Sequence, residues 1–324
     1  MRARSAVPAG QLVHLTPPGS GRAGQTDVGA LALSIVPELP EVETIRRQLA
    51  PHLEGRTLTS VEVLDPRWTR PLPSAPIEQA LRGASIERVG RRGKYLLWSF
   101  SDGQHLLLHL RMTGSLLFDS PTEPLHTRVR FELDDGHRLV YVDPRRFGTG
   151  FLVSDAAELE AYLLERIGVE PLTAAFTADH LRRMARGRRA PVKAFVLDQR
   201  RIAGVGNIYA DEALFRAEIH PLRAAGRLSL AEWARLRDGI EDALAAGIDA
   251  KGASIDDFRH VDGARGSFQD RFLIHRQAGE PCPRCGTTIV KIVVAGRGTY
   301  VCPNCQRPPR RRRAVSSPAR AAVL

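Results

Sequence analysis

The stretch PELPEVETIRR, residues 37–47, marks the point where an ordered fold is expected to begin. Pro40 suits the first turn of a helix, because the N–H that proline lacks has no intrahelical partner there. The acidic residues of the stretch precede its two adjacent arginines, an order that complements the helix dipole. Val42, Ile45 and Leu49 recur at helical spacing on one face. The stretch therefore predicts an amphipathic helix that packs on a core.

Upstream of this helix, residues 1–36 are rich in Gly, Pro, Ala and Ser and show no periodic pattern. Such a composition predicts a disordered extension. Its short apolar run, residues 30–35, comes late and is followed by no small-residue cleavage site, which argues against a secretory signal. Apolar runs elsewhere fall well short of the length that spans a membrane.

Downstream, short β-rich runs follow one another from Leu58 to about Val153. The clearest runs are Tyr95–Phe100, His105–Leu110, Val129–Leu133 and Leu139–Val142, with the turn dipeptides Asp102-Gly103 and Asp135-Gly136 between them. Several short strands at this spacing predict a β-sandwich with flanking helices, which we assign to residues 37–168.

A helical pattern replaces the strands from about Ala174 to Lys251 and is clearest in the Ala- and Leu-rich stretch from Leu228 to Ile248. We assign a helical domain to residues 169–266. The predicted fold is therefore α+β and multidomain.

All four cysteines lie near the C-terminus: Cys282, Cys285, Cys302 and Cys305. The spacing C-x2-C-x16-C-x2-C is typical of a four-cysteine zinc ribbon. Four thiolates close the tetrahedron and leave no position for water, so we expect one structural Zn²⁺ in a module at residues 267–306. Between the cysteine pairs the pattern predicts a β-hairpin with Arg297 at its tip, between two glycines.

The formal net charge of +11 points to a polyanionic partner such as nucleic acid. Most of the excess lies in the tails, because residues 307–324 hold six arginines and no acid. Residues 37–306 hold 38 basic and 35 acidic residues, a net of +3. A soluble protein with a basic, disordered tail at 307–324 would give the same total. Charge alone therefore does not establish DNA binding.

Six ordered motifs across residues 37–306 resemble the formamidopyrimidine-DNA glycosylase family. They are residues 37–43 (PELPEVE), 92–96 (RGKYL), 109–116 (HLRMTGSL), 143–148 (DPRRFG), 204–209 (GVGNIY) and the zinc hairpin. The resemblance implies a bifunctional base-excision repair enzyme. Such an enzyme flips an oxidised purine, 8-oxoguanine or a formamidopyrimidine, out of duplex DNA. It then removes the base through a Schiff base and cleaves the strand by β,δ-elimination.

The resemblance also implies four catalytic roles. Pro37 is the amine nucleophile, which attacks the sugar C1′ and gives an iminium ion. Glu38 is the general acid that protonates the sugar or the departing base. Lys94 is an acid in β-elimination and contacts phosphate, and Arg297 assists δ-elimination and grips a phosphate near the lesion.

Six further residues match DNA-contacting positions of the family. Met112, Arg145 and Phe147 would fill the space left by the flipped base, which needs two apolar wedges and a cation for the widowed cytosine. The loop before Asn207 predicts that this residue caps the following helix. In the family that helix is the second of a helix–two-turn–helix element, and its N-terminus binds a backbone phosphate. His126 and Arg188 match the remaining positions.

In this chain Pro37 is internal, so its nitrogen is a tertiary amide without a lone pair for attack. We hypothesise that translation starts at Val36, through a GUG codon read as methionine, and that removal of this methionine frees Pro37. Proteolytic removal of the extension is the alternative.

Two other functions remain open from the sequence. One is an endonuclease VIII-type enzyme for oxidised pyrimidines, because the segment Phe272–Arg276 resembles the family only loosely and the preceding loop, Gly252–Gln269, is where base preference is often set. The other is a non-catalytic DNA-damage binder, if Pro37 stays blocked. For the enzyme we expect damaged double-stranded DNA as partner, a monomer with no membrane association, and a cytoplasmic, nucleoid-associated location in a bacterium.

Overall fold

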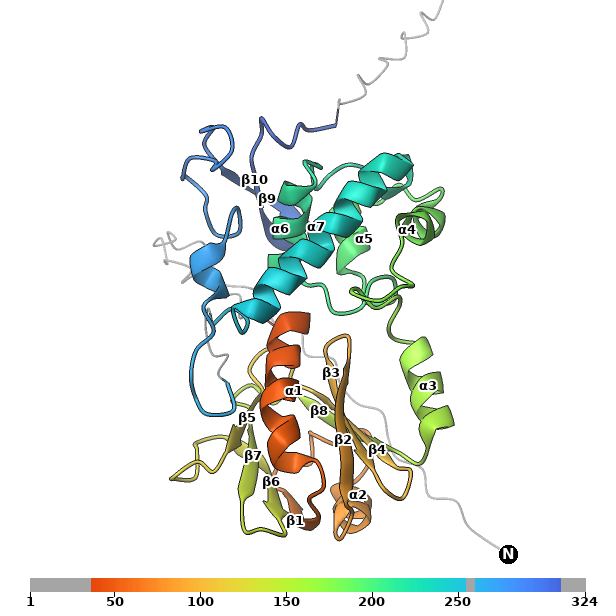
Figure 1. The fold of residues 1–324 in the computed structure, drawn as a ribbon, viewed down its shortest axis with the longest axis vertical. Helices are drawn as coiled ribbons and strands as arrows, with labels where there is room; N and C mark the ends of the chain where they lie inside the picture. The colour runs from red at the N-terminus through yellow and green to blue at the C-terminus, as the bar shows by residue number, and fades with distance from the viewer. Residues whose placement is uncertain (1–35, 255–259, 310–324) are drawn as a thin grey trace, which may run out of the picture. The chain divides into compact units, whose positions relative to one another are not determined.

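The computed structural model describes residues 36–254 and 260–309 (Figure 1). The extension at 1–35, the tail at 310–324 and residues 255–259 of the Gly252–Gln269 loop lie outside the described residues, so the expectations for them stay predictions. Within the described ranges, no helix is both long and apolar enough to cross a bilayer.

The predicted first helix is α1 (Leu39–Leu53), with Glu38 as its N-cap residue. The three apolar residues that define its face are completely buried. Leu39, at its first turn, packs into a helical core, whereas Val42 and Ile45 pack into the core of the β-sandwich. Residues 37 and 38 therefore lie where these two cores meet.

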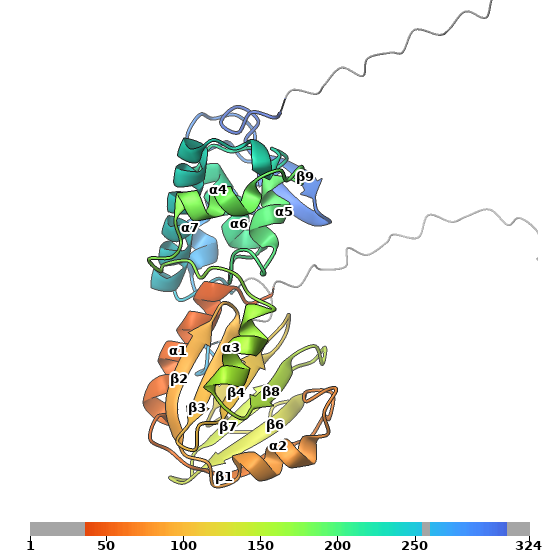
Figure 2. The same cartoon turned by 90° about the vertical axis from the view of Figure 1, so that its right-hand side faces the viewer.

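Two four-stranded antiparallel sheets form the predicted sandwich. One has the order β1 (Leu58–Val63), β6 (Thr127–Leu133), β7 (Arg138–Val142), β5 (Ser115–Phe118), and the other β2 (Ile86–Arg92), β3 (Tyr95–Phe100), β4 (His105–His109), β8 (Thr149–Val153). Alternate residues of β6 are buried, as a strand with one face on a core requires. Trp98 and Phe131, from opposite sheets, meet edge to face with ring centroids 5.0 Å apart. The short helices α2 (Ser74–Leu81) and α3 (Ala156–Leu164) flank the sheets (Figure 2).

The helical part contains α4 (Ala178–Ala185), α5 (Val192–Leu197), α6 (Asn207–Arg216), the short 3₁₀ helix η1 (Ala225–Arg227) and α7 (Leu230–Asp249). Ser229 starts α7 through a reciprocal cap with Glu232. The helices α6 and α7 approach closely at Gly239, where an added Cβ would lie 2.7 Å from the carbonyl oxygen of Ala213. The predicted helical domain is thus a set of short helices packed on one long one.

The zinc module contains η2 (Phe268–Arg271) and the hairpin of β9 (Val290–Val294) and β10 (Arg297–Val301). The prediction that Arg297 is the tip residue was wrong by one position, because Arg297 pairs with Val294 and begins β10. Ala295 and Gly296 form the tip, both with positive φ. The buried Gln306 side chain donates to the carbonyl of Ile219, 3.0 Å away, and so ties the module to the helical part.

Candidate active site and DNA interface

The carboxyl group of Glu38 lies at the N-terminus of α6. It accepts hydrogen bonds from the backbone N–H groups of Gly206 (2.7 Å) and Ile208 (2.9 Å). The loop before α6 needs its glycines for this approach, because an added Cβ on Gly206 would lie 2.3 Å from the Glu38 carboxyl carbon. Gly204 has a φ of +83°, and its carbonyl accepts from Leu39 N–H at 3.0 Å. The Gly204–Gly206 loop thus packs closely against Glu38 and Leu39 at the start of α1.

Burial raises the pKa of Glu38 to about 7, with a smaller upward effect from the nearby Glu41 carboxyl; the Lys94 charge and the two backbone N–H groups limit this rise. Glu41 is itself buried and accepts from the Tyr209 hydroxyl (2.8 Å) and from the N–H groups of Ala253 (2.7 Å) and Glu38 (2.9 Å). A carboxyl group with a pKa near 7 can hold a proton at neutral pH and deliver it, as a general acid must.

Pro37 precedes this carboxyl group directly and is buried. Its nitrogen is joined to Val36 in the chain as written. The structure therefore brings the predicted nucleophile and the predicted acid together, with the Pro37 nitrogen in an amide bond in the chain as written.

Lys94 lies in the turn between β2 and β3 and is half-buried. Burial lowers the pKa of its ammonium group, as does the positive charge of Arg297, while Glu38 and Glu41 raise it. The Lys94 ammonium group thus interacts electrostatically with both Glu38 and Arg297, residues that are far apart from it in sequence.

Arg297 itself is exposed, and the hairpin behind it is anchored to α5 and α6. The Asn207 side-chain amide donates to the carbonyl of Gly298 at 3.1 Å. The completely buried Lys193 ammonium lies 2.7 Å from the Thr299 hydroxyl and 2.7 Å from the Asp211 carboxylate. The element that holds Glu38 therefore also positions Arg297.

The expectation that Asn207 is the helix cap was wrong. Gly206 is the N-cap of α6, and Asn207 is its first helical residue. The physical reason is that the cap residue must bring its backbone against Glu38, which only glycine allows. The N–H groups of Gly206, Ile208 and Tyr209 all donate to the Glu38 carboxyl. The group that the N-terminus of α6 binds in this structure is therefore the Glu38 side chain.

Met112, Arg145 and Phe147 lie on two loops that Asp143 joins. The buried Asp143 carboxylate accepts from the Thr113 hydroxyl, from Arg145 N–H (3.2 Å) and from Gly148 N–H (2.8 Å). The Arg145 guanidinium lies 4.9 Å from the ring centroid of Phe147. Phe147 is 48% exposed and Met112 is half-buried, so neither is an ordinary core residue. Exposure on a fixed loop fits a side chain that wedges into a base stack.

The two remaining predicted DNA contacts are exposed. His126 has a φ of +72° and accepts Asp143 N–H through its carbonyl at 3.0 Å, which places it beside the same loops. Arg188 follows α4, and its carbonyl accepts Gly226 N–H at 3.0 Å. Gly226 lines a cavity of about 260 Å³, whose charged lining residues are Asp179, Arg182, Arg183, Arg186 and Arg227.

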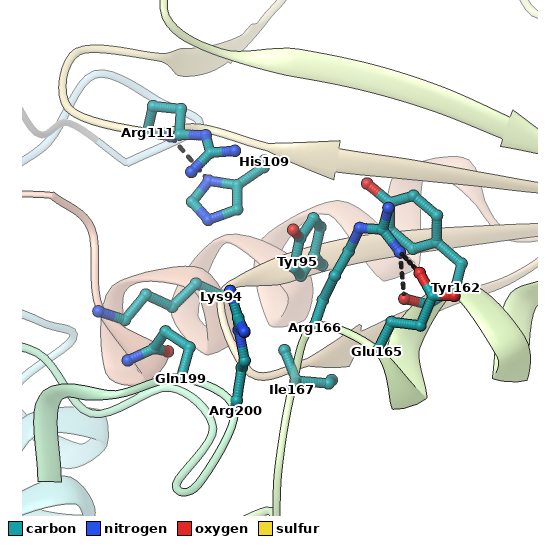
Figure 3. Close-up of a pocket in the computed structure, with 10 residues that line it drawn as sticks. All are labelled: Lys94, Tyr95, His109, Arg111, Tyr162, Glu165, Arg166, Ile167, Gln199 and Arg200. Carbon is teal, nitrogen blue, oxygen red and sulfur yellow. Dashed lines mark hydrogen bonds and ion pairs between the residues drawn. The ribbon is translucent and has the colours of Figure 1, made fainter. Parts of the chain in front are cut away.

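A cavity of about 540 Å³ opens beside Lys94 and contains residues that the sequence analysis missed (Figure 3). Its walls include Arg111, Arg166 and Arg200 as well as His109. The His109 Nδ1 atom accepts Arg111 N–H at 3.0 Å, and burial holds the pKa of the imidazole well below 6.5. The ring is therefore neutral with its proton on Nε2, a donor suited to a phosphate oxygen. Its place in the HLRMTGSL motif was the only signal in the sequence.

The four cysteine Sγ atoms lie within 4.8 Å of one another. Cys285 lies 3.5 Å from Cys302 and 3.5 Å from Cys305, and Cys282 lies 3.9 Å from Cys305. Tetrahedral zinc with bonds of about 2.3 Å needs sulfur–sulfur edges of about 3.8 Å. The cluster therefore fits one structural Zn²⁺, which would crosslink the two knuckles below the Arg297 hairpin.

Three family models match successive parts of the chain. They are the formamidopyrimidine-DNA glycosylase N-terminal domain at residues 36–150, the H2TH domain of the same enzyme at 167–259, and the zinc finger found in FPG and IleRS at 279–308. The predicted domain bounds at 168 and 266 are not fixed by these matches.

Relatives match over nearly their whole length. The formamidopyrimidine-DNA glycosylase of Pelotomaculum thermopropionicum is 44% identical, and the match covers 84% of this chain and 99% of the relative. The crystal structure of the MutM (FPG) protein from Thermus thermophilus has a TM-score of 0.75 and 43% identity, over 83% of this chain and 98% of that one. The Lactococcus lactis FPG (MutM) complex with Fapy-dG containing DNA has a TM-score of 0.76 and 37% identity, over 84% and 100%. With the fold and the motifs in agreement, the chain belongs to the formamidopyrimidine-DNA glycosylase family.

Proposed function

We propose that this protein is a bifunctional base-excision repair enzyme, a formamidopyrimidine-DNA glycosylase and abasic-site lyase that removes oxidised purines from duplex DNA. The observation that carries the proposal is the buried Glu38 carboxyl, with a pKa of about 7, beside Pro37 and under the influence of Lys94. A protonatable acid next to a prospective amine nucleophile is what imine formation at a sugar carbon needs.

The proposed reaction begins with the free secondary amine of Pro37. Its lone pair bonds to C1′ of the flipped nucleoside, the glycosidic bond breaks, and the proline nitrogen loses its proton. The C1′–O4′ bond of the sugar then opens, which leaves an iminium ion. Glu38 supplies a proton to the departing base or to the ring oxygen O4′. The iminium ion then acidifies the C2′–H, so its loss expels the 3′ phosphate by β-elimination. A second elimination expels the 5′ phosphate. Lys94 and Arg297 would deliver protons and bind these phosphates.

The cavity beside Lys94 supports a polyanionic substrate. Lys94, Arg111, Arg166 and Arg200 line it, and Glu165, which is 2.9 Å from Arg166, is its one acidic wall residue among the described residues. Met112, Arg145 and Phe147 would fill the hole in the duplex, while His126, Arg188 and Asn207 would contact its backbone. The protein would act as a monomer on damaged duplex DNA, in the cytoplasm and at the nucleoid.

This chemistry requires that the active form begin at Pro37, so the test compares two chains. Each is incubated with borohydride and a duplex that carries 8-oxoguanine opposite cytosine. We expect a covalent adduct with the chain that begins at Pro37 and none with the full chain. Binding without an adduct from the Pro37 chain would instead support the non-catalytic binder.

A parallel duplex with an oxidised pyrimidine separates the purine enzyme from the endonuclease VIII type. Faster trapping on the 8-oxoguanine duplex supports the proposal, and faster trapping on the pyrimidine lesion overturns its substrate assignment. Undamaged duplex is the control for adducts that do not depend on a lesion.

A further inference from the structure

The turn that carries Lys94 is clamped by a pair of ionic side chains that the reaction does not use. Arg91, at the end of β2, is 12% exposed and lies between two carboxylates. Its Nε lies 3.1 Å from Glu43 of α1, and its Nη1 forms an ion pair with Glu170. The same Nη1 donates to the carbonyl of Gly93 at 3.0 Å. One guanidinium therefore joins α1, the turn and the segment after α3.

Glu170 completes the clamp from the other side. Its second carboxylate oxygen accepts Gly93 N–H at 2.8 Å, and its side chain is 13% exposed. Glu170 follows Val169, whose N–H donates to the carbonyl of Arg201 at 3.1 Å and whose carbonyl accepts from Ala203 N–H at 3.0 Å. The carboxylate is thus mounted on the segment that pairs with the chain leading into the Gly204–Gly206 loop around Glu38.

Gly93 leaves the turn little freedom between these partners. Both of its backbone polar groups are bound, and its φ is +55°, a region that favours glycine. An added Cβ would lie 3.3 Å from the Cβ of Ala203 and 3.4 Å from Gly204 N. Because Lys94 is the next residue, the orientation of its main chain is set by the atoms that hold Gly93.

We propose that Glu170, acting with Arg91, is a positioning residue for Lys94 in strand cleavage. The inference rests on the proposed role of Lys94. Loss of the Glu170 charge frees the Gly93 turn and lets the Lys94 ammonium move relative to Glu38 and the phosphates. Misplacement of a catalytic group by about 1 Å can slow a reaction about 100-fold.

The neighbouring ion pair offers a matched control. Arg92 and Glu160 connect the same turn to α3, but they lie 3.5 Å apart, are 38% and 55% exposed, and bind no atom of Gly93. Exposed pairs of this kind contribute little to stability. Glu160→Gln therefore removes a similar charge at a similar place without releasing the turn.

The experiment uses a chain that begins at Pro37 and keeps the sandwich, the helical part and the zinc module. Single-turnover β-elimination on a duplex with an abasic site is measured for Glu170→Gln, Lys94→Ala, the double variant and Glu160→Gln. We expect Glu170→Gln to slow elimination about 10- to 100-fold, with duplex affinity changed less than about threefold. The double variant should be no slower than Lys94→Ala alone, because both changes act through one side chain. Glu160→Gln should match the parent.

Multiplicative effects in the double variant, or a parental rate for Glu170→Gln, would overturn the proposal. If Glu170→Gln melts before the assay temperature, Arg91→Lys serves instead, because lysine keeps the charge but cannot bind two carboxylates and the Gly93 carbonyl together. An unchanged rate for Lys94→Ala would refute the catalytic role of Lys94 itself. A slow Lys94→Ala variant together with a parental rate for Glu170→Gln would instead overturn only the positioning role of Glu170.

Discussion

The Glu38 carboxylate and the backbone N–H of Gly206 lie 2.7 Å apart, a contact that joins the first residues of α1 to the N-terminus of α6. It joins Glu38 to α6, the helix whose Asn207 side chain also binds the Arg297 hairpin. It also explains how the acid is tuned, because burial raises its pKa while the α6 N–H groups limit the rise.

The pH dependence of base excision follows from Glu38. A general acid acts in its protonated form, so the role proposed for Glu38 predicts that the single-turnover excision rate of a Pro37-starting chain falls as pH rises through about 7. Glu38→Gln should lower the rate about 100-fold or more and abolish this limb. An unchanged basic limb in the variant would assign it to another group.

Stability should respond to the same pKa. The folded state holds the Glu38 proton up to about pH 7, whereas the unfolded chain releases it near 4.5, so ionisation destabilises the fold progressively between these values. The melting temperature of Glu38→Gln, relative to the parent, should therefore rise from pH 4.5 to pH 7 and stay level above. A difference that is constant with pH would contradict the raised pKa.

The close approach at Gly206 is testable with a pair of alanine variants. Gly206→Ala places a Cβ 2.3 Å from the Glu38 carboxyl carbon, so we expect loss of excision and a destabilisation of about 1–3 kcal/mol. Gly90→Ala is the control, because its nearest contact is an ordinary 3.8 Å. Thermal melts and excision assays of both variants measure the difference. Equal melting temperatures and excision rates for the two variants would show that α6 can move away from Glu38 to make room for the added methyl group.

Phe147 should matter to the duplex and little to the fold. Its side chain is 48% exposed, so Phe147→Ala should cost less than about 1 kcal/mol in a denaturant melt, whereas Phe131→Ala in the core should cost about 3–5 kcal/mol. The same Phe147 variant should excise 8-oxoguanine slowly but process an abasic site at near the parental rate. Equal losses on both substrates would argue against a base-wedging role.

Arg188 should contribute one backbone contact. If it neutralises one phosphate, Arg188→Ala should lower the slope of log Kd against log salt by about 0.9 without changing lesion preference. The salt dependence of duplex binding, measured by fluorescence anisotropy, gives this slope. Arg138→Ala is the control, since that guanidinium lies 2.9 Å from Glu132 on the sandwich. An equal change of slope in both variants would contradict a specific phosphate contact by Arg188.

Zinc removal should separate catalysis from the N-terminal fold. Metal analysis should find one zinc per chain, bound by the four cysteines. Because the Arg297 hairpin rests on this cluster, chelation should abolish strand cleavage, while the sandwich core should melt as before. Added Zn²⁺ should restore cleavage. Full cleavage by metal-free protein would contradict a structural role for the ion.

Local sequence patterns predicted the main secondary structure and the cysteine cluster well. The helix after Pro37, the strands, the turns at Gly103 and Gly136 and the cysteine cluster all depend on spacing within short stretches, which a sequence displays directly. The grouping of Glu38, Lys94 and Arg297 came from the family resemblance, because no local pattern connects such distant residues.

Other features depend on tertiary contacts and could not be read from the chain. The sequence shows His109 only as a strand residue. Its charge and tautomer depend on its burial and on the Nδ1 contact with Arg111 N–H. The role proposed for Glu170 depends on its contact with Arg91, 79 positions earlier. The cap before α6 was assigned to Asn207 because propensity favours asparagine, whereas the approach of Glu38 selects Gly206.

The most direct test of the account is to identify the residue that bonds to DNA. A Pro37-starting chain is trapped with borohydride on an 8-oxoguanine duplex, digested, and the nucleotide-bearing peptide is sequenced by mass spectrometry. We predict a reduced adduct on the nitrogen of an N-terminal Pro37. An adduct on Lys94, or on any residue other than Pro37, would contradict it.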